Sequence, residues 1–419
     1  MTATAAAPGP AQVEMPKDPS RGRQIIRDIL GGSVVISILA VVVGLVVGAI
    51  LIAVTDPGVQ AASGYFFDRP GATFAALGDS VGGAYSSLFQ GAIYDFGRPD
   101  FLSGIAPLMN TLDLATPLIL GGLGLALGFR IGLFNIGGQG QTLVGGAVAG
   151  WVAWSFPLPF PWGLILSIVA GIVGGAVAGG VVGLLKARTG ASEVIVTIML
   201  NYIVFYFISL LLRTPGALQA AGTINPKSPS PPDSARVPDL FGAQFSVTWM
   251  FVIAIAATVF FWWLMSRSSL GFKFRAVGEN PAAARTAGIG VDSMYIWGMV
   301  LSGALVGLVG VNQVLAFTVG GFGSGFDAGI GFNAITVALL GRSRPLGVFL
   351  AGLLFGALNS GGYVMQAAND IPIDIVLVVQ SIVVLFIAAP PLVRVLFGLP
   401  RPGTAPRRRA KAPKAVEAE

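Results

Sequence analysis

Long stretches without a charged side chain are the feature that most constrains how this chain folds. Seven stretches of about twenty residues or more contain no Asp, Glu, Lys or Arg. A helix needs roughly twenty residues, at about 1.5 Å each, to cross a hydrocarbon layer about 30 Å thick. Each stretch can therefore form a membrane-spanning helix. The seven cover residues 29–55, 162–185, 194–212, 245–266, 293–317, 346–366 and 375–393.

Three further segments are less regular candidates for spans. Residues 108–129 carry Asp113, residues 141–160 follow an entry rich in Gly and Gln, and residues 329–341 are short. Only 11% of the chain is charged, against about 25% in a soluble domain. We therefore expect an all-α membrane protein with about ten transmembrane helices.

The basic residues predict how these spans are oriented. If the amino terminus is cytoplasmic and the spans alternate, 20 of the 25 basic residues but only 8 of the 19 acidic ones lie in the cytoplasm. This bias follows the positive-inside rule, so we expect a multi-pass protein of the cell membrane with both termini cytoplasmic. The expected parts are a disordered tail over 1–28, a transmembrane permease domain over 29–397 and a basic tail over 398–419.

A short motif occurs twice along the chain. Phe134-Asn135-Ile136-Gly137, with Gln141 four positions after Gly137, returns as Phe326-Asp327-Ala328-Gly329 with Asn333 four positions after Gly329. A Pro-x-Gly step and an apolar helix follow each block. Five elements separate the blocks, so they would run in opposite directions. This predicts an inverted five-plus-five repeat, with halves over about 29–212 and 245–397 joined by an external loop over 213–244.

Glycines in both blocks predict that the third and eighth elements are broken or re-entrant, because each would weaken a continuous helix by about 1 kcal/mol relative to alanine. Hydrocarbon does not tolerate the unpaired backbone groups of a broken helix, so we expect a protein-enclosed, hydrated cavity there. Close helix packing around glycine is the alternative. The expected substrate-pathway residues are Phe134, Asn135, Gln139, Gln141, Asn201, Phe326 and Asn333.

The missing residue types narrow the chemistry. The chain contains no Cys and no His, which removes the common nucleophiles, bases and metal ligands, so we expect neither a catalytic nor a metal site. The acidic residues fall near span ends, so no ionisable group at membrane depth is evident. A neutral, hydrogen-bonding solute is therefore expected, with sodium coupling as an open alternative. No nucleotide-binding phosphate loop occurs, so any ATP must be hydrolysed by a partner.

The longest internal cytoplasmic loop, 267–292, predicts a short capped helix. Asn280 suits the N-cap, Pro281 the first helical position and Gly288 the end. Glu279 and Arg285 would then be available to a partner. An ordinary interfacial helix is the alternative to a docking role.

Three stretches resemble the larger permease subunit of nucleoside-type ABC importers, within a broader family that also moves ribose, other simple sugars and branched-chain amino acids. Residues 129–141 resemble the family block FRxGLFNIGxEGQ, with Gln139 where that block usually has glutamate. Residues 190–202 resemble GxxEVIxTIMLNYI, which favours nucleosides over ribose. The third stretch joins residues 275–285 to residues 331–342 and the following 345–347.

The resemblance implies inward transport of nucleosides by alternating access, driven by a separate ATPase, with residues 279–285 as the coupling helix. It implies three partners: a second, smaller permease forming a heterodimer, an ATPase with two fused nucleotide-binding halves, and an extracytoplasmic substrate-binding lipoprotein. No cofactor on this chain and no nucleic acid are expected. The alternatives are a permease for ribose or another simple sugar, an ion-coupled carrier or channel acting alone, and a membrane anchor.

Overall fold

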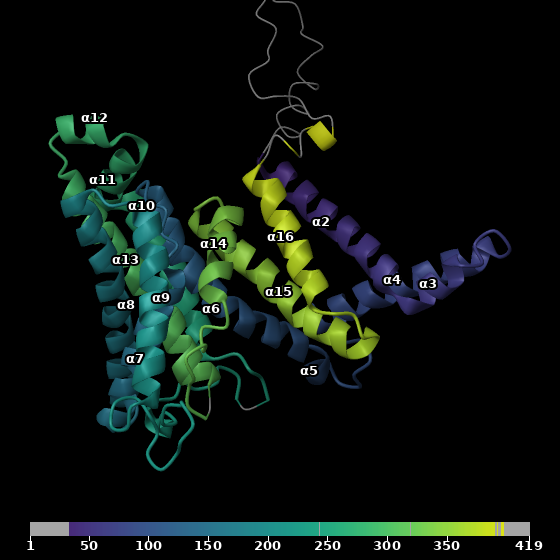
Figure 1. Ribbon diagram of the computed structural model, residues 1–419, viewed down its shortest axis with the longest axis horizontal. Helices are drawn as coiled ribbons and strands as arrows, with labels where there is room; N and C mark the ends of the chain where they lie inside the picture. The colour runs from purple at the N-terminus through teal and green to yellow at the C-terminus, as the bar shows by residue number, and fades with distance from the viewer. Residues whose placement is uncertain (1–32, 243, 319, 390–391, 393–394, 398–419) are drawn as a thin grey trace, which may run out of the picture.

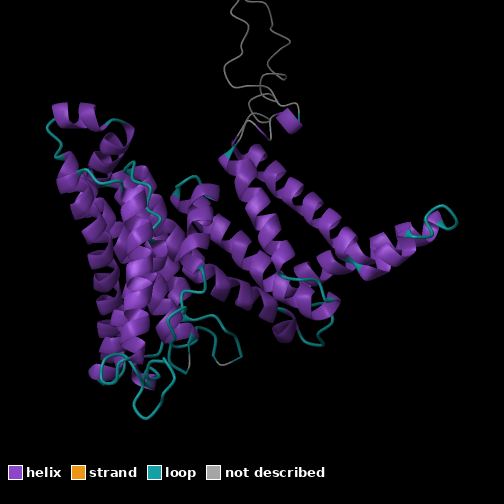
Figure 2. Cartoon of the chain, in the orientation of Figure 1, coloured by secondary structure: helices purple, strands orange, loops and turns teal. Residues whose placement is uncertain are grey.

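The computed structural model describes residues 33–397 apart from 243, 319, 390–391 and 393–394, and in this part of the chain every regular element is a helix (Figure 2). Both predicted tails and the first residues of the first predicted span lie outside the described residues. The expected all-α fold is confirmed for the remainder.

Seven helical stretches of the described chain are long and apolar enough to cross a membrane. The ten-span prediction goes further and stays a prediction, because the helices at its third, eighth and tenth spans do not meet that criterion. The seven stretches correspond to α2 (Ser33–Thr55), α5 with α6 (Phe101–Gly104, Ala106–Arg130), α8 (Trp162–Thr189), α9 (Glu193–Arg213), α10 (Trp249–Arg267), α13 with η2 (Val291–Asn312, Gln313–Phe317) and α15 (Pro345–Asn369).

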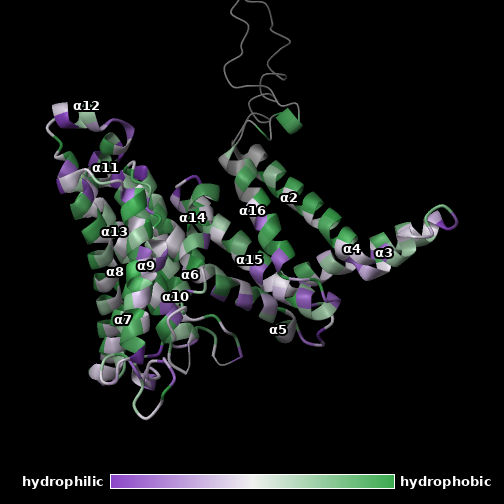
Figure 3. Ribbon diagram, in the orientation of Figure 1, coloured by the Kyte–Doolittle hydropathy of each residue, from purple (hydrophilic) through white to green (hydrophobic). Residues whose placement is uncertain are grey.

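The remaining helices are shorter or more polar. Three of them, α7 (Gly138–Ser155), α14 (Ile330–Leu340) and α16 (Asp374–Ala388), occupy the other predicted spans. Figure 3 shows that apolar residues dominate the long helices, whereas polar residues gather around α11 and α12. The others are α3 (Pro57–Ser63), α4 (Pro70–Ala92), α11 (Ser269–Glu279), α12 (Pro281–Thr286) and the 3-10 turn η1 (Asp233–Ala235).

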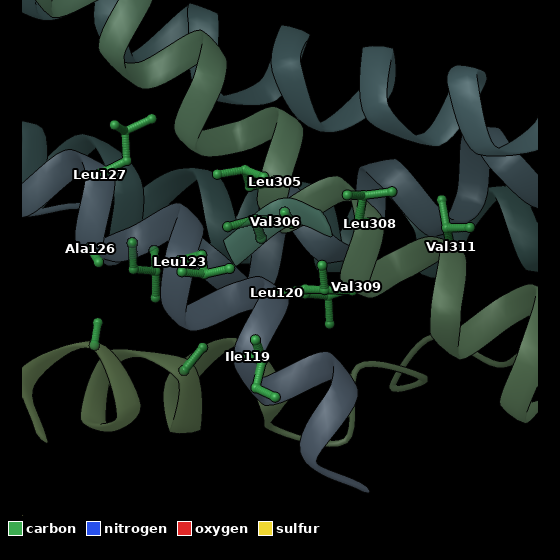
Figure 4. Close-up of a cluster of buried hydrophobic side chains, with 14 of the residues drawn as sticks. Ile119, Leu120, Leu123, Ala126, Leu127, Leu305, Val306, Leu308, Val309 and Val311 are labelled. Atoms are coloured by element: carbon green, nitrogen blue, oxygen red, sulfur yellow. The ribbon is translucent and has the colours of Figure 1, made fainter. Parts of the chain in front are cut away.

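Helices α6 and α13 pack against each other through buried apolar side chains (Figure 4). Leucine, isoleucine and valine side chains from both helices interdigitate there. Between membrane-spanning helices such contacts stabilise the fold through van der Waals packing, because lipid is as apolar as these side chains. Leu120, Leu123 and Leu127 of α6 and Val306 and Val309 of α13 have at most 1% of their surface exposed.

Glycines bring α8 and α13 into backbone contact along their length. A β-carbon added at Gly175 would overlap the carbonyl oxygen of Gly303, and one added at Gly179 would overlap that of Met299. Small residues permit such close approach of two helices. Glycines therefore hold α8 close against α13.

The packing of the two halves follows parallel patterns. The pair α8–α13 corresponds in the expected repeat to α15–α6, and both pairs are in extensive contact. Likewise α7 packs on α8, α9 and α13, whereas α14 packs on the equivalent α15, α16 and α6. The first helix of each half departs from this pattern, because α2 packs on α16 whereas α10 packs on α6 and α15.

The segment before α6 forms helices, and one of them packs against the helix bundle. Helix α4 packs against α15, and Leu88 and Gly91 of α4 lie directly against Gly361 and Val364. The hydroxyl of Ser360 donates to the carbonyl of Gly91 at 2.7 Å. Beyond this contact, α3 and the start of α4 extend away from the helix bundle (Figure 1).

Candidate functional site

The first interruption separates α6 from α7 and is organised by Asn135. This side chain is fully buried, and its Oδ1 accepts a hydrogen bond from the backbone N–H of Gly137 at 2.8 Å. Its Nδ2 donates to the Gln141 side chain at 3.2 Å and to the Ser302 hydroxyl at 3.0 Å. Ser302 in turn donates to the carbonyl of Gly124 at 2.6 Å. Asn135 and Gln141 therefore hold the turn in place rather than face open space.

Helix α7 begins earlier than the glycine pattern indicates. Gly138 and Gly140 lie in its first turn, and the interruption occupies residues 131–137. The break predicted from the glycines of the first block therefore ends earlier than that pattern indicates, because Gly138 and Gly140 are already helical. The first N–H groups of a helix lack intrahelical partners, and here Gly140 N–H donates to Asn201 Oδ1 at 2.8 Å.

The second interruption separates η2 from α14 and is centred on Asp327. Its carboxyl group accepts a hydrogen bond from the backbone N–H of Gly329, the same two-residue turn that Asn135 makes with Gly137. Ala328 and Gly329 both have positive φ, at 47° and 74°, which ends the irregular segment and starts α14.

Asp327 is the site residue that the sequence reasoning undervalued. It was expected near a span end, yet only 2% of its surface is exposed. Its Oδ2 atom has no hydrogen-bond partner among the described residues. The repeat offered the one signal that could have identified it, because Asp327 stands where the first block has Asn135.

The two interruptions touch each other. A β-carbon on Gly138 would lie 2.6 Å from the carbonyl oxygen of Gly331, and one on Gly331 would overlap the backbone of Gln139. Across this contact the Gln139 side chain hydrogen-bonds to Asp327. The first turns of α7 and α14 therefore meet inside the protein.

From this meeting point the two half-helices run toward opposite ends of the molecule (Figure 1). The end of α7 leads to Gly163, which lies beside Ser234 of the 213–244 segment. The residues after α14 reach the other end, where Arg130 Nε donates to the carbonyl of Ser343 at 2.9 Å. An inverted repeat requires this antiparallel arrangement.

A small hollow lies beside the first interruption. It has a volume of about 160 Å³ and is bounded by α7, α8 and α9, with Gln141, Thr197 and Asn201 as its polar lining. Ligand pockets usually measure about 300–1,000 Å³, so this hollow is smaller than a typical binding pocket. Asn201 also donates to the Ile136 carbonyl at 3.0 Å and thereby fixes the interruption from a third helix.

The remaining predicted pathway residues are not gathered with the amides. Phe134 is 41% exposed and stacks on Phe129 with ring centroids 4.8 Å apart. Phe326 packs on Phe322 at 4.7 Å and against Gly146 of α7. Asn333 lies half-buried in the first turn of α14.

The 213–244 segment covers the second interruption. Ser228 pairs with Phe322 through two hydrogen bonds of 2.9 Å, from Ser228 N–H to the Phe322 carbonyl and from Phe322 N–H to the Ser228 hydroxyl. Val237 N–H donates to the carbonyl of Leu315 at 3.1 Å. This segment is therefore packed onto the helix break.

The predicted capped helix between α10 and α13 is present. The Asn280 side chain accepts hydrogen bonds from Ala282 and Ala283 N–H, both at 3.0 Å, and Pro281 is the first helical residue of α12. Glu279, Asn280, Pro281 and Arg285 are all exposed, and Arg285 lies 3.8 Å from Asp292. The preceding helix α11 was not expected, since the loop was interpreted as one helix.

The base of this projection contacts the chain next to the first interruption. Gly278, near the end of α11, lies against the backbone of Arg130 and Gly132, and a β-carbon there would overlap the Arg130 carbonyl oxygen. Asn135 follows three residues after Gly132. The base of α11 is therefore in direct backbone contact with the chain beside the first interruption.

A larger pocket lies away from the interruptions. It measures about 980 Å³ and lies between α4, α5 and the start of α6, with Asp95, Arg98, Asp100 and Asn110 in its lining. Asp95 and Arg98 form an ion pair of 3.1 Å at its edge. Sequence reasoning missed this pocket, because the four residues come from a segment without a motif.

Comparison with known proteins gives the following likenesses. Residues 108–388 match the family described as the permease component of branched-chain amino acid transport systems. The guanosine ABC transporter permease protein NupP of Bacillus subtilis is 32% identical over 366 residues, which are 87% of this chain and 95% of that protein. The glucose ABC transporter permease protein TsgB13 of Haloferax volcanii is 36% identical over 67% of this chain and 75% of that protein. The nucleoside ABC transporter permease protein NupB of Lactococcus lactis is 35% identical over 74% of this chain and 84% of that protein. No solved structure matches the chain.

Proposed function

This chain belongs to the family of branched-chain amino acid transport system permease components, and from that premise we propose that it is the membrane-spanning subunit of an ATP-driven importer of nucleosides. Two of the relatives with extensive coverage are named as guanosine and nucleoside permeases. The chain has no phosphate loop of its own, so the ATP is hydrolysed by a partner subunit.

The contact between the two interrupted helices is the observation that carries this proposal. Half-helices that meet within a membrane protein provide backbone N–H groups and polar side chains at the depth where a solute must cross. Amides of Asn135, Gln139, Gln141 and Asn201 and the carboxyl group of Asp327 are gathered there. Amides and hydroxyls suit a neutral solute that forms hydrogen bonds.

The architecture supports an inverted repeat of five plus five spans, with α7 and α14 as its broken members. The matched turns at Asn135 and Asp327, the opposite directions of the two half-helices and the parallel helix pairings favour it. Alternating access then corresponds to a rocking of the halves about the contact between Gly138 and Gly331. The distribution of basic residues supports cytoplasmic positions for both termini.

The partners follow from this assignment. Helix α12 docks on the cytoplasmic ATPase, whose nucleotide-binding halves are fused, and transmits its motion through α11 to the chain beside Asn135. A second, smaller permease completes the membrane unit, and an extracytoplasmic lipoprotein delivers the solute. The exposed cap and charges of Asn280, Glu279 and Arg285 fit a docking helix.

Import of a simple sugar is the second candidate, because a glucose permease relative is 36% identical over 67% of this chain. Nucleosides and sugars share hydroxyl groups, so both would use the same amide lining. The chain's 190–202 block favours nucleosides, as does the greater coverage of the guanosine permease.

Uptake of radiolabelled guanosine by cells that carry the chain with its partner subunits tests the proposal. We expect ATP-dependent uptake that excess unlabelled nucleoside blocks and excess glucose does not. Block by glucose alone would favour the sugar permease. Flux through the purified chain in liposomes without an ATPase would identify a carrier or channel that acts alone.

The double variant Glu279→Ala with Arg285→Ala tests the docking role of α12. We expect ATP-driven import to fall by at least about tenfold, the change produced by roughly 1.4 kcal/mol in the coupling equilibrium. Asn225→Ala, an exposed asparagine of the 213–244 segment, is the matched control and keeps full import. Unchanged import by the double variant would show that α12 is an ordinary interfacial helix.

A further inference from the structure

A buried carboxylate oxygen without a partner lies where the two half-helices meet. Asp327 has 2% of its surface exposed, and its Oδ2 accepts no hydrogen bond from any described residue. An unpaired polar atom in such a place costs about 1–3 kcal/mol, and more for a charged group. An acidic group kept within the membrane at this cost marks a functional site by default.

The helix ends beside Asp327 disfavour a bound cation. The amino-terminal ends of α7 and α14 meet beside it, and each carries a partial positive charge from its backbone N–H groups. Gln139 and the Gly329 N–H already donate to the carboxyl group. A further neutral N–H or O–H donor is the group that this arrangement accommodates at Oδ2.

Gln139 belongs to the same arrangement. A glutamate there would place two carboxylates in contact, which would favour protonation of one of them. The amide avoids this conflict, and it leaves Asp327 as the acidic acceptor between the two first turns.

We propose that Asp327 contacts the translocated solute directly, its Oδ2 accepting a hydrogen bond from an N–H or O–H group of the nucleoside when α7 and α14 part. This inference rests on the proposed function and adds the residue that would select for donor groups on the solute. In the conformation described here, Gln139 occupies one side of the carboxyl group and the solute is excluded.

Import kinetics of Asp327→Asn test the proposal in the complete complex. Asparagine keeps the shape and one oxygen acceptor but removes the charge. Hydrogen bonds to charged groups contribute about 1.5–3 kcal/mol, so we expect the KM for guanosine to rise at least about tenfold. The matched control is Asp113→Asn, which removes a part-buried acid near the amino-terminal end of α6. The KM of this variant stays within about twofold of wild type.

A panel of nucleosides that each lack one donor separates recognition from folding. Inosine lacks the exocyclic amine of guanosine, N1-methylguanosine lacks the ring N–H, and the 2′-, 3′- and 5′-deoxy forms each lack one hydroxyl. In the wild type, one of these deletions is expected to raise the KM about as much as Asp327→Asn does. In the variant, the same deletion is expected to add nothing, because both changes remove one hydrogen bond.

Three results would overturn the inference. They are an unchanged KM in Asp327→Asn, an equal loss of maximal rate for every nucleoside at constant KM, and a wild-type KM that no single deletion alters. The last measurement needs no variant, so it decides the question even if Asp327→Asn fails to assemble. Failure of the proposed function is distinct, since the wild type would then import no nucleoside at all.

Discussion

The two interruptions share a backbone turn but differ in how completely their side chains are paired. At the first, Asn135 bonds to Gly137, Gln141 and Ser302 in a buried network. At the second, Asp327 bonds to Gly329 and Gln139 and keeps one oxygen unpaired. The amide at the first break is thus paired on both of its polar atoms, whereas the carboxyl group at the second keeps one acceptor free among the described residues.

The two interruptions also differ in the segments that contact them. The first lies next to the base of α11, where Gly278 meets Arg130 and Gly132. The second is covered by the 213–244 segment through Ser228 and Phe322. One break is thus connected to the end of the molecule that carries α12, and the other to the opposite end.

The largest effect is expected from Gly331→Val, which forces the two interruptions apart. Its side chain would overlap the backbone of Gln139 and Gly138. Overpacking of this kind costs about 3 kcal/mol or more where neither neighbour is a flexible side chain. We expect loss of import and a lower thermal unfolding temperature of the purified complex.

Gly325→Val is the matched control for this prediction. A β-carbon there meets no atom within 4 Å, and the glycine has no positive φ. It should leave the unfolding temperature and import close to wild type. Equal tolerance of both variants would mean that the contact between the breaks has no role in the fold.

A smaller effect is expected from Asn135→Asp, which gives the first interruption the side-chain type of the second. The change removes the Nδ2 donor to Ser302 and Gln141 and adds a buried acid. Leaving such groups unpaired costs about 2 kcal/mol, which calorimetry of the complex would detect. Unchanged stability would show that a carboxyl group serves as well as an amide at the first interruption. The contrast between the two interruptions would then not hold.

Asn280→Ala tests the capped helix on the side of the first interruption. Loss of two hydrogen bonds from Ala282 and Ala283 N–H costs about 1 kcal/mol of helix stability. We expect a several-fold drop in ATP-driven import with little change in the unfolding temperature of the membrane part. Asn280→Asp, which keeps the cap, should restore import; a loss in both variants would assign Asn280 to direct partner contact.

The smallest effect is expected at Asp56, an acidic residue outside the interruptions. Hydrogen bonds from the Ser80 hydroxyl at 2.7 Å and from Val59 N–H at 2.9 Å hold the pKa of Asp56 below its ordinary value of 3.8. Its contribution to stability is therefore complete above pH 3.8 and is lost as the pH falls through the lowered pKa.

Ser80→Ala should raise the pKa of Asp56 and slightly weaken the complex at neutral pH. The difference from wild type should vanish once the pH is below the lowered pKa of Asp56, where the carboxyl group is protonated in both. Thermal unfolding as a function of pH measures this. A difference that persists at low pH would assign the effect to packing of α4 rather than to the carboxylate.

The sequence predicted the helical class, the paired motifs and the capped helix, because each depends on local patterns. Each prediction rests on residues that are close together in the sequence. They are the charge-free runs, the blocks around Asn135 and Asp327, and the Asn280-Pro281 step. The start of α7 was misplaced, because the unpaired N–H groups of its first turn depend on partners distant in the sequence, such as Asn201, which accepts from Gly140.

The burial of Asp327 and the role of Ser302 could not be predicted in the same way. Ser302 lies 167 positions from Asn135 and belongs to no motif. Asp327 was expected at a span end because linear distance from the apolar run was the only guide. Its position depends on how α14 packs against α6 and α7, which is a property of the whole fold.

The glycine seam between α8 and α13 has a mechanical consequence. Backbone atoms of Gly175 and Gly179 lie directly against Met299, Gly303 and Gly307. Few side chains lie between these backbones that could change rotamer and absorb a shift, so we expect the two helices to move together. A motion that opens a route for solute would then pivot around this pair, at its looser border with α9.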